Sequence, residues 1–562
     1  MAIDKYPKIA PSRPGTQVII DSTGLEGSAT DSTKAIVVFG SATSGEPNQL
    51  YNLTSLSQAK EIFKSGDLVD FAEIAWSPST DTVGAGNIYA ARVDSAQQAT
   101  LTKGNLTINS EVWGASANNI SLTLEDNTLT NSKRLTIDDG VLNDREVYDN
   151  LGNIFTVSYS GSQAVATIAI ASGVLTLSAG ADAEHVDPIA TYKLVNYSDL
   201  MTIISDINNH DGFDAEFTPF GEKGVSPVLL EEQSGDLKSE GDFTVKAVAA
   251  DIALQTEYSG LVSIVAKDNT TVANFTGQLS GGSNGSVPAS WASSFQILAE
   301  QDAPYAYYVV ALSPDATVHA ELSAFVTEQA ASGFPLVSIV GGNAGESISK
   351  LLGRQRALYS SRVAMTAIEP IVTMSDGRSL SVPPYLATAF IAGIASGIPV
   401  GDKVEYKHLR ISGLARSFTY DQLNQLHQNG VIVAEKVRGI SNNGSYRVVS
   451  DVTTQNTKSD PVQSELSLRE ITDFLAVELK DMLDSTFVGT RATDTSASII
   501  KAHVSSFFLQ QMNAGVIQTY SEDNISVVIE NGIARINAIL SPSRGINNIY
   551  MTLDYESSTL SA

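Results

Sequence analysis

Cysteine is absent from this 562-residue chain, and its absence removes three kinds of chemistry. The chain cannot form disulfides, thiolate metal sites or a cysteine nucleophile, so its fold does not depend on the redox state of its compartment. The six histidines show neither an H-E-x-x-H motif nor an i, i+4 pair; they stand at 185, 210, 319, 408, 427 and 503. Without cysteine ligands or paired histidines, we expect no metal site and no cofactor.

Positive charge is also scarce. The chain has 35 Lys and Arg against 62 Asp and Glu, for a formal net charge of −27. Such a surface repels nucleic acid and anionic membranes, so we expect neither as a partner. It also keeps free subunits soluble, which matters if they must wait before they assemble.

Long apolar runs are missing as well. The N-terminal stretch MAIDKYPKIAPSRPG contains no apolar region of signal-peptide type. The least polar window, 382–400, is bounded by Pro383, Pro384 and Pro399 and filled with Ala, Gly and Ser. This composition predicts a buried helix of a soluble protein rather than a membrane-inserted segment.

The residue composition and the hydrophobic periodicity of the sequence change twice along the chain. Residues 34–93 alternate strand-like and helix-like segments, a Thr-, Val- and Ile-rich region begins near 104, and helical periodicity returns near 275. We therefore predict an α+β multidomain protein, in which an α/β body is interrupted by a mostly β inserted domain. The predicted divisions are an N-terminal arm (1–22), the α/β domain (23–103 plus 275–360), the inserted β-rich domain (104–274), a C-terminal α/β core domain (361–545) and a C-terminal arm (546–562).

Local signals mark the first helix and a late hairpin. A helix in the segment SLSQAKEIFKSG is expected to begin at Ser55 or Ser57 and to end at Gly66. The segment ISVVIENGIARINAIL, residues 525–540, places two strands around Asn531-Gly532, which is the strongest short hairpin signal. The hairpin therefore belongs to the C-terminal domain.

Two later helices carry capping-box spacing. Thr419 and Gln422 form one such pair, and Gly430 marks the end of that helix. Ser467 and Glu470 form the second pair, at the start of a longer helix. The apolar stripe of this helix recurs at spacings of three and four, and comprises Leu468, Ile471, Leu475, Leu479 and Met482.

The segment AIVVFGSATSGEP has the G-x-x-x-x-G frame of a phosphate-binding loop, from Gly40 to Gly45. A Walker loop requires Lys after the second glycine to reach the phosphates. Here Glu46 and Pro47 follow, and a carboxylate repels phosphate while proline lacks an amide donor. We therefore interpret the segment as a buried strand that ends in a turn.

The segment GGSNG, residues 281–285, fits the G-x-S-x-G frame of a hydrolase, with Ser283 as nucleophile. Five small residues also suit a tight turn before a helix, and no histidine downstream has a loop signature around it. We favour the turn and expect no enzymatic activity, while a serine hydrolase remains an alternative. The acidic segment NNHDGFDAEF lacks the spacing of a calcium loop and is interpreted as a solvated loop.

One span of the chain is basic. Residues 346–447 contain 12 Lys and Arg against 7 Asp and Glu, although the whole chain has a net charge of −27. This excess is explained either by local ion pairing or by a positive face for an acidic protein partner.

Six motifs in sequence order resemble one family, the sheath proteins of contractile phage tails, of the type found in large myoviruses of Gram-positive hosts. They are the strand and turn VVFGSATSGEP, the strand YAARV ending at Arg92 and Val93, the turn LSGGSNG, the segment SVPPYLATAFIAGIASG, the helix and strand DQLNQLHQNGVIV, and the C-terminal helix, hairpin and exposed end. Residues 104–274 carry little resemblance, apart from GASANNISL. The resemblance implies that this inserted domain is the variable part of the family.

The resemblance implies a structural role without ATP. Sheath subunits stack as hexameric rings around an inner tube, and terminal arms add strands to the sheet of a neighbouring subunit. Rigid bodies then rotate and slide during contraction, which drives the tube through the host envelope for genome delivery. The implied partners are further copies of the chain, the tail tube protein, and baseplate and tail terminator proteins, in a virion assembled in the host cytoplasm.

Specific residues follow from this implied mechanism. The expected donated strands contain Gln17, Val18, Ile19, Ile20, Ile549, Met551, Leu553 and Tyr555. They would pair beside the hairpin residues Val527, Ile529, Ile533 and Ile536. The expected tube-facing basic residues are Lys403, Lys407, Arg410 and Arg416. Two alternatives stay open, namely a serine hydrolase using Ser283 and a β-rich surface or adhesin protein, which the missing signal sequence disfavours.

Overall fold

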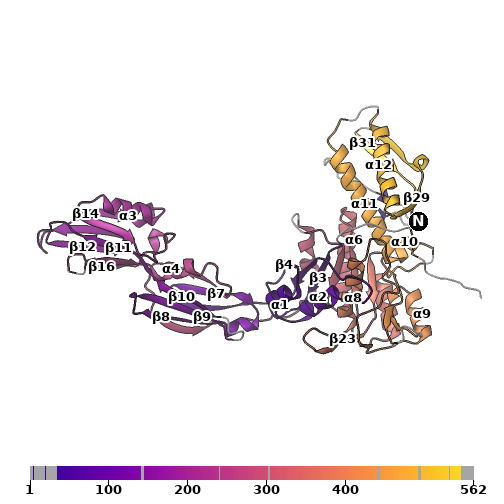
Figure 1. The fold of residues 1–562 in the computed structure, drawn as a ribbon, viewed down its shortest axis with the longest axis horizontal. Helices are drawn as coiled ribbons and strands as arrows, with labels where there is room; N and C mark the ends of the chain where they lie inside the picture. Colours follow the sequence, from indigo (N-terminus) through magenta and orange to yellow (C-terminus); the bar gives the residue numbers. More distant parts are fainter. Residues whose placement is uncertain are drawn as a thin grey trace, which may run out of the picture. The chain divides into compact units, whose positions relative to one another are not determined.

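The computed structural model describes most of the chain as a mixed α/β multidomain protein (Figure 1). The described residues are 4–5, 19–20, 34–140, 145–239, 241–300, 304–438, 444–457, 459–491, 495–530 and 532–545. They fall into two compact units. Unit 1 holds the described residues of 1–42, 47–93 and 287–562, and unit 2 holds 43–46 and those of 94–286.

A seven-stranded sheet forms the centre of unit 1, in the order β26-β22-β21-β20-β3-β5-β4. The strands are β3 Ile36–Gly40, β4 Leu50–Leu53, β5 Ile88–Arg92, β20 Tyr308–Ala311, β21 Val337–Gly341, β22 Val363–Thr366 and β26 Val431–Ile432. All neighbours run parallel except β4, which pairs antiparallel with β5 at one edge. The strands read as continuous apolar runs because helices cover both faces of the sheet.

Alternate residues of β3 show the two faces. Ile36 and Val38 belong to one hydrophobic core, together with residues of α1 (Leu56–Phe63), α2 (Asp67–Trp76) and α8 (Pro384–Gly397). Val37 and Phe39 belong to the opposite core, which is completed by α5 (Ala292–Phe295), α6 (Ala316–Ala331), α7 (Ile348–Leu358) and α9 (Tyr420–Gln428). The sheet therefore lies between two helical layers, as in other doubly covered parallel sheets.

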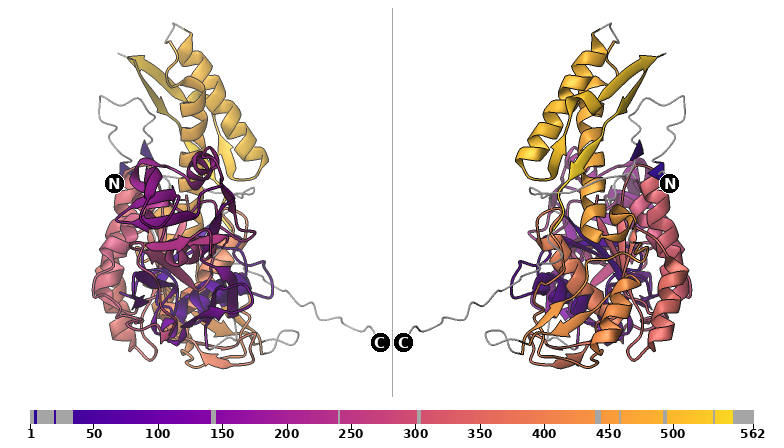
Figure 2. Two further views of the ribbon diagram at one scale, coloured as in Figure 1. Left: turned by 90° about the vertical axis from the view of Figure 1, so that its left-hand side faces the viewer. Right: turned by 90° about the vertical axis from the view of Figure 1, so that its right-hand side faces the viewer.

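Two small sheets and a C-terminal lobe complete unit 1. The small sheets consist of β23 Pro370–Thr373, β24 Ser379–Ser381 and β25 Gly413–Leu414, and of β27 Ala434–Lys436 and β28 Tyr446–Val448. After α10 (Pro461–Ser464), the long helix α11 (Leu466–Phe487) leaves the body. We call its second half, from Leu475, the C-terminal lobe, together with α12 Ser496–Asn513, β29 Ile517–Tyr520, β30 Ser526–Glu530, β31 Ile533–Asn537 and β32 Leu540–Pro542 (Figure 2).

Unit 2 is mostly antiparallel β-structure with two hydrophobic cores. The first core lies in the sheets of β6 Gln98–Lys103, β7 Leu106–Trp113 and β18 Val262–Ala266, and of β8 Ser121–Asn127, β9 Ser132–Asp138, β10 Arg145–Leu151 and β19 Phe275–Gln278. The second lies in those of β11 Asn153–Tyr159, β15 Phe213–Phe217 and β17 Phe243–Lys246, and of β12 Val165–Ala171, β13 Val174–Gly180, β14 Val186–Lys193 and β16 Gln233–Asp236, with helix α3 Leu200–Asn208. Helix α4 (Val248–Gln255) contributes to both cores.

Short 3-10 helices occur in both units. They are η1 Ala115–Asn119, η2 Leu194–Asn196, η3 Pro227–Leu229, η4 Gln296–Ala299 and η5 Glu522–Asn524.

The chain enters the second core of unit 2 at Gly152 and leaves it at Ala247, and these two residues are hydrogen-bonded to each other. The carbonyl of Gly152 accepts a hydrogen bond from the amide of Ala247 at 3.0 Å, and its amide donates to the buried carboxylate of Asp251 at 2.5 Å. Gly152 has φ of 97°, and a Cβ there would meet Val248 Cγ2 at 2.5 Å. Glycine is required because both the positive φ and the close approach exclude a side chain.

The first predicted helix begins where one of the two candidate caps stands. The Ser55 side chain accepts a hydrogen bond from the amide of Gln58, which makes Ser55 the N-cap of α1. The predicted end at Gly66 is wrong, because α1 stops at Phe63. Gly66, with φ of 115°, instead precedes α2 as its N-cap residue.

One of the two predicted capping boxes is confirmed. Thr419 and Gln422 make both reciprocal hydrogen bonds at the start of α9, and Gly430 follows its end with φ of 74°. The second box is wrong, because α11 begins at Leu466 and Ser467 lies inside it. The Ser467 hydroxyl donates to the buried carboxylate of Asp451 instead, at 2.6 Å.

The apolar window at 382–400 forms the predicted buried helix, α8, in the core beneath the sheet. No described helix combines the length and apolar character needed to cross a bilayer. The predicted hairpin is also confirmed, since β30 and β31 pair antiparallel with Glu530 opposite Ile533. Asn531 lies outside the described residues.

Candidate functional site

The C-terminal lobe presents the predicted hairpin on a small helical core. That core contains Leu475 and Leu483 of α11, and Val504 and Phe508 of α12. Three of the four predicted hairpin residues, Val527, Ile529 and Ile536, are half-buried and pack against this core. The fourth, Ile533, is 54% exposed. One face of the hairpin therefore holds it on the lobe, while the strands themselves stay at the surface.

The strands of this lobe form two separate two-stranded sheets, β29-β32 and β30-β31. Each of the four strands thus has one paired edge and one edge that faces no other strand among the described residues. An unpaired edge presents a row of backbone N–H and C=O groups that can pair with a further strand. Apolar side chains also point outward here, with Val528 48% and Ile539 64% exposed.

The predicted terminal strands are described only at one place. Ile19 and Ile20 form β2 (Ile19–Ile20), which pairs antiparallel with β1 (Asp4–Lys5). The remaining predicted residues of these strands lie outside the described residues, and they are Gln17, Val18, Ile549, Met551, Leu553 and Tyr555. Their pairing with the hairpin therefore stays a prediction.

Buried charges fix the root of α11 in the body of unit 1. Glu470 forms a salt bridge with Lys34 at 2.6 Å, and both side chains are 4% exposed. Its carboxylate also accepts hydrogen bonds from the hydroxyl of Tyr308 at 3.0 Å and from the amide of Gly401 at 3.1 Å. Burial raises the pKa of Glu470, while Lys34 and these donors lower it. Three separate segments thus converge on one side chain of the helix.

One turn further along α11, Asp473 forms a second buried cluster. It accepts hydrogen bonds from Arg362 at 2.8 and 3.0 Å, from Arg469 at 2.9 Å and from the hydroxyl of Tyr307 at 3.0 Å. Burial, with the nearby carboxylate of Asp473, raises the pKa of Tyr307 well above its usual value. The Tyr307 hydroxyl therefore stays protonated and donates a hydrogen bond to Asp473. Removing a partner from such a cluster leaves buried charge uncompensated.

The four predicted basic residues fall into two groups. Lys403 and Arg416 are engaged within the chain, because Lys403 binds Glu465 at 2.7 Å and Arg416 binds Glu369 at 3.3 Å. The Arg416 guanidinium also lies over the ring of Phe418, at 4.5 Å from its centroid. By contrast, Arg410 is exposed and Lys407 is half-buried. Arg410 is therefore the member of the set best placed to meet a partner.

Ser283 belongs to a turn that is bound to strand β6 of unit 2. Its backbone exchanges hydrogen bonds with Gln97, and its hydroxyl oxygen accepts one from the amide of Gly285 at 3.1 Å. Gly281 and Gly285 have φ of 87° and 69°, as tight turns require. Among the described residues, no group of three or more His, Asp or Glu side chains could hold a metal ion.

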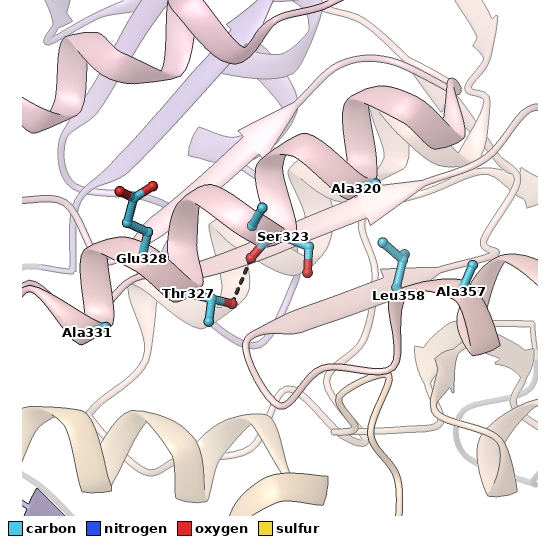
Figure 3. A pocket seen from close by; sticks show the side chains of 8 residues that line it. Ala320, Ser323, Thr327, Glu328, Ala331, Ala357 and Leu358 are labelled. Atoms are coloured by element: carbon cyan, nitrogen blue, oxygen red, sulfur yellow. Dashed lines mark hydrogen bonds between the residues drawn. The ribbon is translucent and has the colours of Figure 1, made fainter. Parts of the chain in front are cut away.

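A shallow hollow of about 530 Å³ lies between α6 and α7 (Figure 3). Its walls are mostly small side chains, and the lining residues are Ala320, Ser323, Ala324, Thr327, Glu328, Ala331, Ala357 and Leu358. The Thr327 hydroxyl is turned back to the carbonyl of Ser323, at 2.7 Å (Figure 3). The hollow offers no cluster of polar groups that would orient a small ligand.

No family model matches the chain. The chain is 39% identical, over 574 residues, to a protein of Enterococcus phage phiEF24C described as a tail sheath protein, with 100% of both chains covered. It is 35% identical, again with 100% of both chains covered, to the tail sheath protein of Staphylococcus phage Twort. The chain belongs to the tail sheath protein family.

Solved structures of this family share the fold. The sheath tail protein of Desulfitobacterium hafniense aligns with a TM-score of 0.55 and 14% identity, over 96% of this chain and 99% of that one. The sheath tail protein of Listeria innocua aligns with a TM-score of 0.57 and 12% identity, over 92% and 94%. The resemblance to sheath proteins from phages of Gram-positive hosts, drawn from the six motifs, is thereby confirmed.

The buried charges on α11 are the feature that sequence reasoning missed. The capping-box spacing places Glu470 at a helix cap, and no local pattern marks Asp473, because charged residues on a helix normally face solvent. Their partners Lys34 and Arg362 are separated from them by more than a hundred residues. No local spacing signals such a pair.

Proposed function

We propose that this protein is the structural subunit of the contractile tail sheath of a bacteriophage. In this role it polymerises around the tail tube and contracts, and contraction drives the tube through the host envelope during genome delivery. The proposal is supported by full-length similarity to tail sheath proteins and by the shared fold of solved sheath tail proteins. Its partners would be further copies in hexameric rings, the tube protein, and baseplate and terminator proteins of the virion.

The open strand edges of the C-terminal lobe carry the proposed mechanism of assembly. Arms 1–22 and 546–562 of neighbouring copies would add strands beside the hairpin, so that main-chain hydrogen bonds link the subunits. A two-stranded hairpin is marginally stable by itself, and added strands would extend its sheet. The outward-facing Val528, Ile533 and Ile539 would then be covered.

The division of the chain fits two different tasks. In this proposal, the α/β domain (23–103 plus 275–360) and the core domain (361–545) move together as one rigid body during contraction, because strands of both belong to the seven-stranded sheet. The buried bridges of Lys34 with Glu470 and of Arg362 with Asp473 would keep the lobe attached to the body while the arms hold the lattice together. The inserted domain (104–274) would be the variable part.

Truncation of the arms tests this function. Variants lacking 1–22 or 546–562 should remain folded, soluble monomers, because the described cores contain neither segment. Negative-stain electron microscopy should show tubular polymers for the full chain and none for the truncated forms. Circular dichroism and gel filtration serve as controls for folding. Polymers that still form without the arms would contradict strand donation.

Contact with the tube is tested separately at Arg410. Arg410→Glu should weaken co-assembly with the tube protein and leave folding intact, because Arg410 is exposed and makes no ion pair within the described part of the chain. Reversal of Arg416 should act through stability as well, since it breaks the pair with Glu369. Arg145→Glu, at an exposed position on strand β10 of unit 2, is the matched control. Unchanged co-assembly of the Arg410 variant would contradict the prediction that the basic span contacts the tube.

A further inference from the structure

A polar cavity of about 210 Å³ lies in unit 1 where the chain leaves the C-terminal lobe toward its last segment. It is lined by Lys403, Glu405, His427, Asp451, Val452, Asn456, Thr457, Pro461, Ser464, Glu465 and Arg544. Several of these residues are half-exposed, among them Glu405 and Asn456, so the cavity opens to the surface. Three carboxylates, one lysine and one arginine share this small volume.

On one wall of the cavity, the carboxylate of Glu465 is paired with two cations, Arg544 and Lys403. Both Nε and Nη2 of Arg544 donate to Glu465 Oε1, at 3.1 and 2.8 Å, and Lys403 Nζ donates to Glu465 Oε2 at 2.7 Å. Burial opposes ionisation here, yet Lys403 and Arg544 hold the pKa of Glu465 below its usual value. Gly545 lies against the Lys403 stem, where a Cβ would meet Lys403 Cε at 3.0 Å. This wall therefore fixes the root of the C-terminal segment.

Among the described residues, the opposite wall of the cavity contains no cation other than the shared Lys403. Asp451 is 3% exposed, and its Oδ2 accepts hydrogen bonds from the amide and hydroxyl of Ser467. Its Oδ1 is buried and has no hydrogen-bond partner within the described part of the chain. Glu405 reaches Lys403 only at 4.0 Å, and that lysine is already bound to Glu465. Asp451 and Glu405 thus have only Lys403 as a nearby cation, and Lys403 lies closer to Glu465.

The titration of these groups agrees with a missing positive charge. Burial raises the pKa of Glu405 to about 7, and it also raises the pKa of Asp451. Burial lowers the pKa of His427, so its imidazole is neutral at neutral pH and adds no charge. A cation with hydrogen-bond donors, placed beside Asp451 Oδ1, would relieve both carboxylates.

The geometry favours an organic cation over a metal ion. The described residues contain no group of three His, Asp or Glu side chains arranged to hold a metal. An ammonium or guanidinium group needs only one or two acceptors and fits a cavity of this size. We propose that the cavity binds the terminal group of a lysine or arginine from the N-terminal segment of a second copy of this chain.

The charge of the two terminal segments selects this occupant. The inference rests on the proposed function, in which both segments reach neighbouring copies. The C-terminal segment 546–562 has Asp554 and Glu556 and no basic residue, so an acid-rich cavity would repel it. The N-terminal segment 1–22 has three basic residues, Lys5, Lys8 and Arg13, against two acidic residues, Asp4 and Asp21, for a net charge of +1. Only the N-terminal segment is complementary to Asp451 and Glu405.

Cysteine cross-linking can test the contact directly, because the natural chain has no cysteine. Glu405→Cys would be combined with Lys8→Cys or Arg13→Cys, and assembled polymers would be oxidised and run on a non-reducing gel. We expect at least one pair to link different copies in polymers and neither pair to link in monomers. Glu328→Cys on the exposed face of α6, combined with the same N-terminal substitutions, is the matched control and should not link.

A charge cycle gives a second, independent readout. Lys8→Ala with Arg13→Ala, and separately Glu405→Gln, should each raise the protein concentration needed for polymerisation by about tenfold, which corresponds to ~1.4 kcal/mol. The combined variant should lose no more than either parent, because the two changes remove the same contact. Additive losses would mean that Glu405 acts only within its own copy.

Each other outcome overturns the inference in a recognisable way. Links within one copy would show that the cavity takes its own segment. Polymers that form without any cross-link would contradict the contact between the N-terminal segment and the cavity. Loss of polymers on deletion of 1–22 would still support the proposed function. A requirement for K⁺ or Mg²⁺ that disappears in Glu405→Gln, without cross-links, would assign the cavity to an inorganic cation.

Discussion

Replacing Asp473 with asparagine removes the negative charge from a cluster that water does not reach. Its partners Arg362 and Arg469 have side chains only 6% and 1% exposed, and Asp473 itself is fully buried. Asparagine preserves the shape of the side chain but leaves two guanidinium groups facing a neutral amide. Neither arginine can lose its proton to relieve the charge, because its pKa lies far above neutral pH.

The cost of this change follows from the burial of the pair. Removing one member of a buried ion pair typically destabilises a protein by about 3–5 kcal/mol, since the remaining charge stays desolvated. The same substitution at Asp484, on the same helix, affects a pair with Lys480 whose side chains are 28% and 33% exposed. An exposed pair of this kind contributes about 0.2–1 kcal/mol. Asp473→Asn should therefore cost several times more than Asp484→Asn.

We expect the two units to unfold in separate transitions, because each has its own hydrophobic cores, and scanning calorimetry would then measure this difference. At roughly 2 °C per kcal/mol, Asp473→Asn should lower the unfolding temperature of unit 1 by roughly 6–10 °C, and Asp484→Asn by at most about 2 °C. The transition of unit 2 should not move, since Asp473 belongs to unit 1. Equal, small shifts for the two variants would refute the argument that this cluster anchors α11.

Two further predictions concern the body of unit 1. Ser55→Ala should cost about 1 kcal/mol, because it removes the N-cap of α1, whereas Ser57→Ala inside the exposed face of the helix should be neutral or slightly stabilising; equal effects in urea unfolding would contradict the cap. Burial, together with nearby Arg354, lowers the pKa of His319 to about 4, below its usual value near 6.5. Between these two pKa values, His319 binds a proton in the unfolded chain but not in the folded chain. The free energy of unfolding therefore decreases as pH falls from about 6.5 to about 4, by up to ~3 kcal/mol. His319→Gln should show a smaller fall in unfolding temperature between pH 7 and 4.5, and an unchanged fall would remove His319 as a cause.

Much of the local structure was determined by the sequence itself. The capping box of Thr419 and Gln422 and the hairpin around Gly532 depend on contacts between residues a few positions apart, which short-range chemistry specifies. The apolar stripe of α11 was also predictable, and Leu468, Ile471 and Leu475 lie in the core of the C-terminal lobe or beside its root. Ordered motifs over the full chain likewise indicated the family.

The tertiary structure alone decided which polar residues are buried and what they do. Ser467 and Glu470 have the spacing of a capping box, yet the helix begins earlier and both side chains bind groups from other parts of the chain. In the same way, Lys403 and Arg416 form internal ion pairs, while Asp451 and Glu405 have no close cation of their own among the described residues of a cavity that four chain segments enclose. The physical reason is that the free energy of a charge depends on its burial and on its nearest partners, and these are set by contacts between separate segments of the chain, which no local pattern encodes.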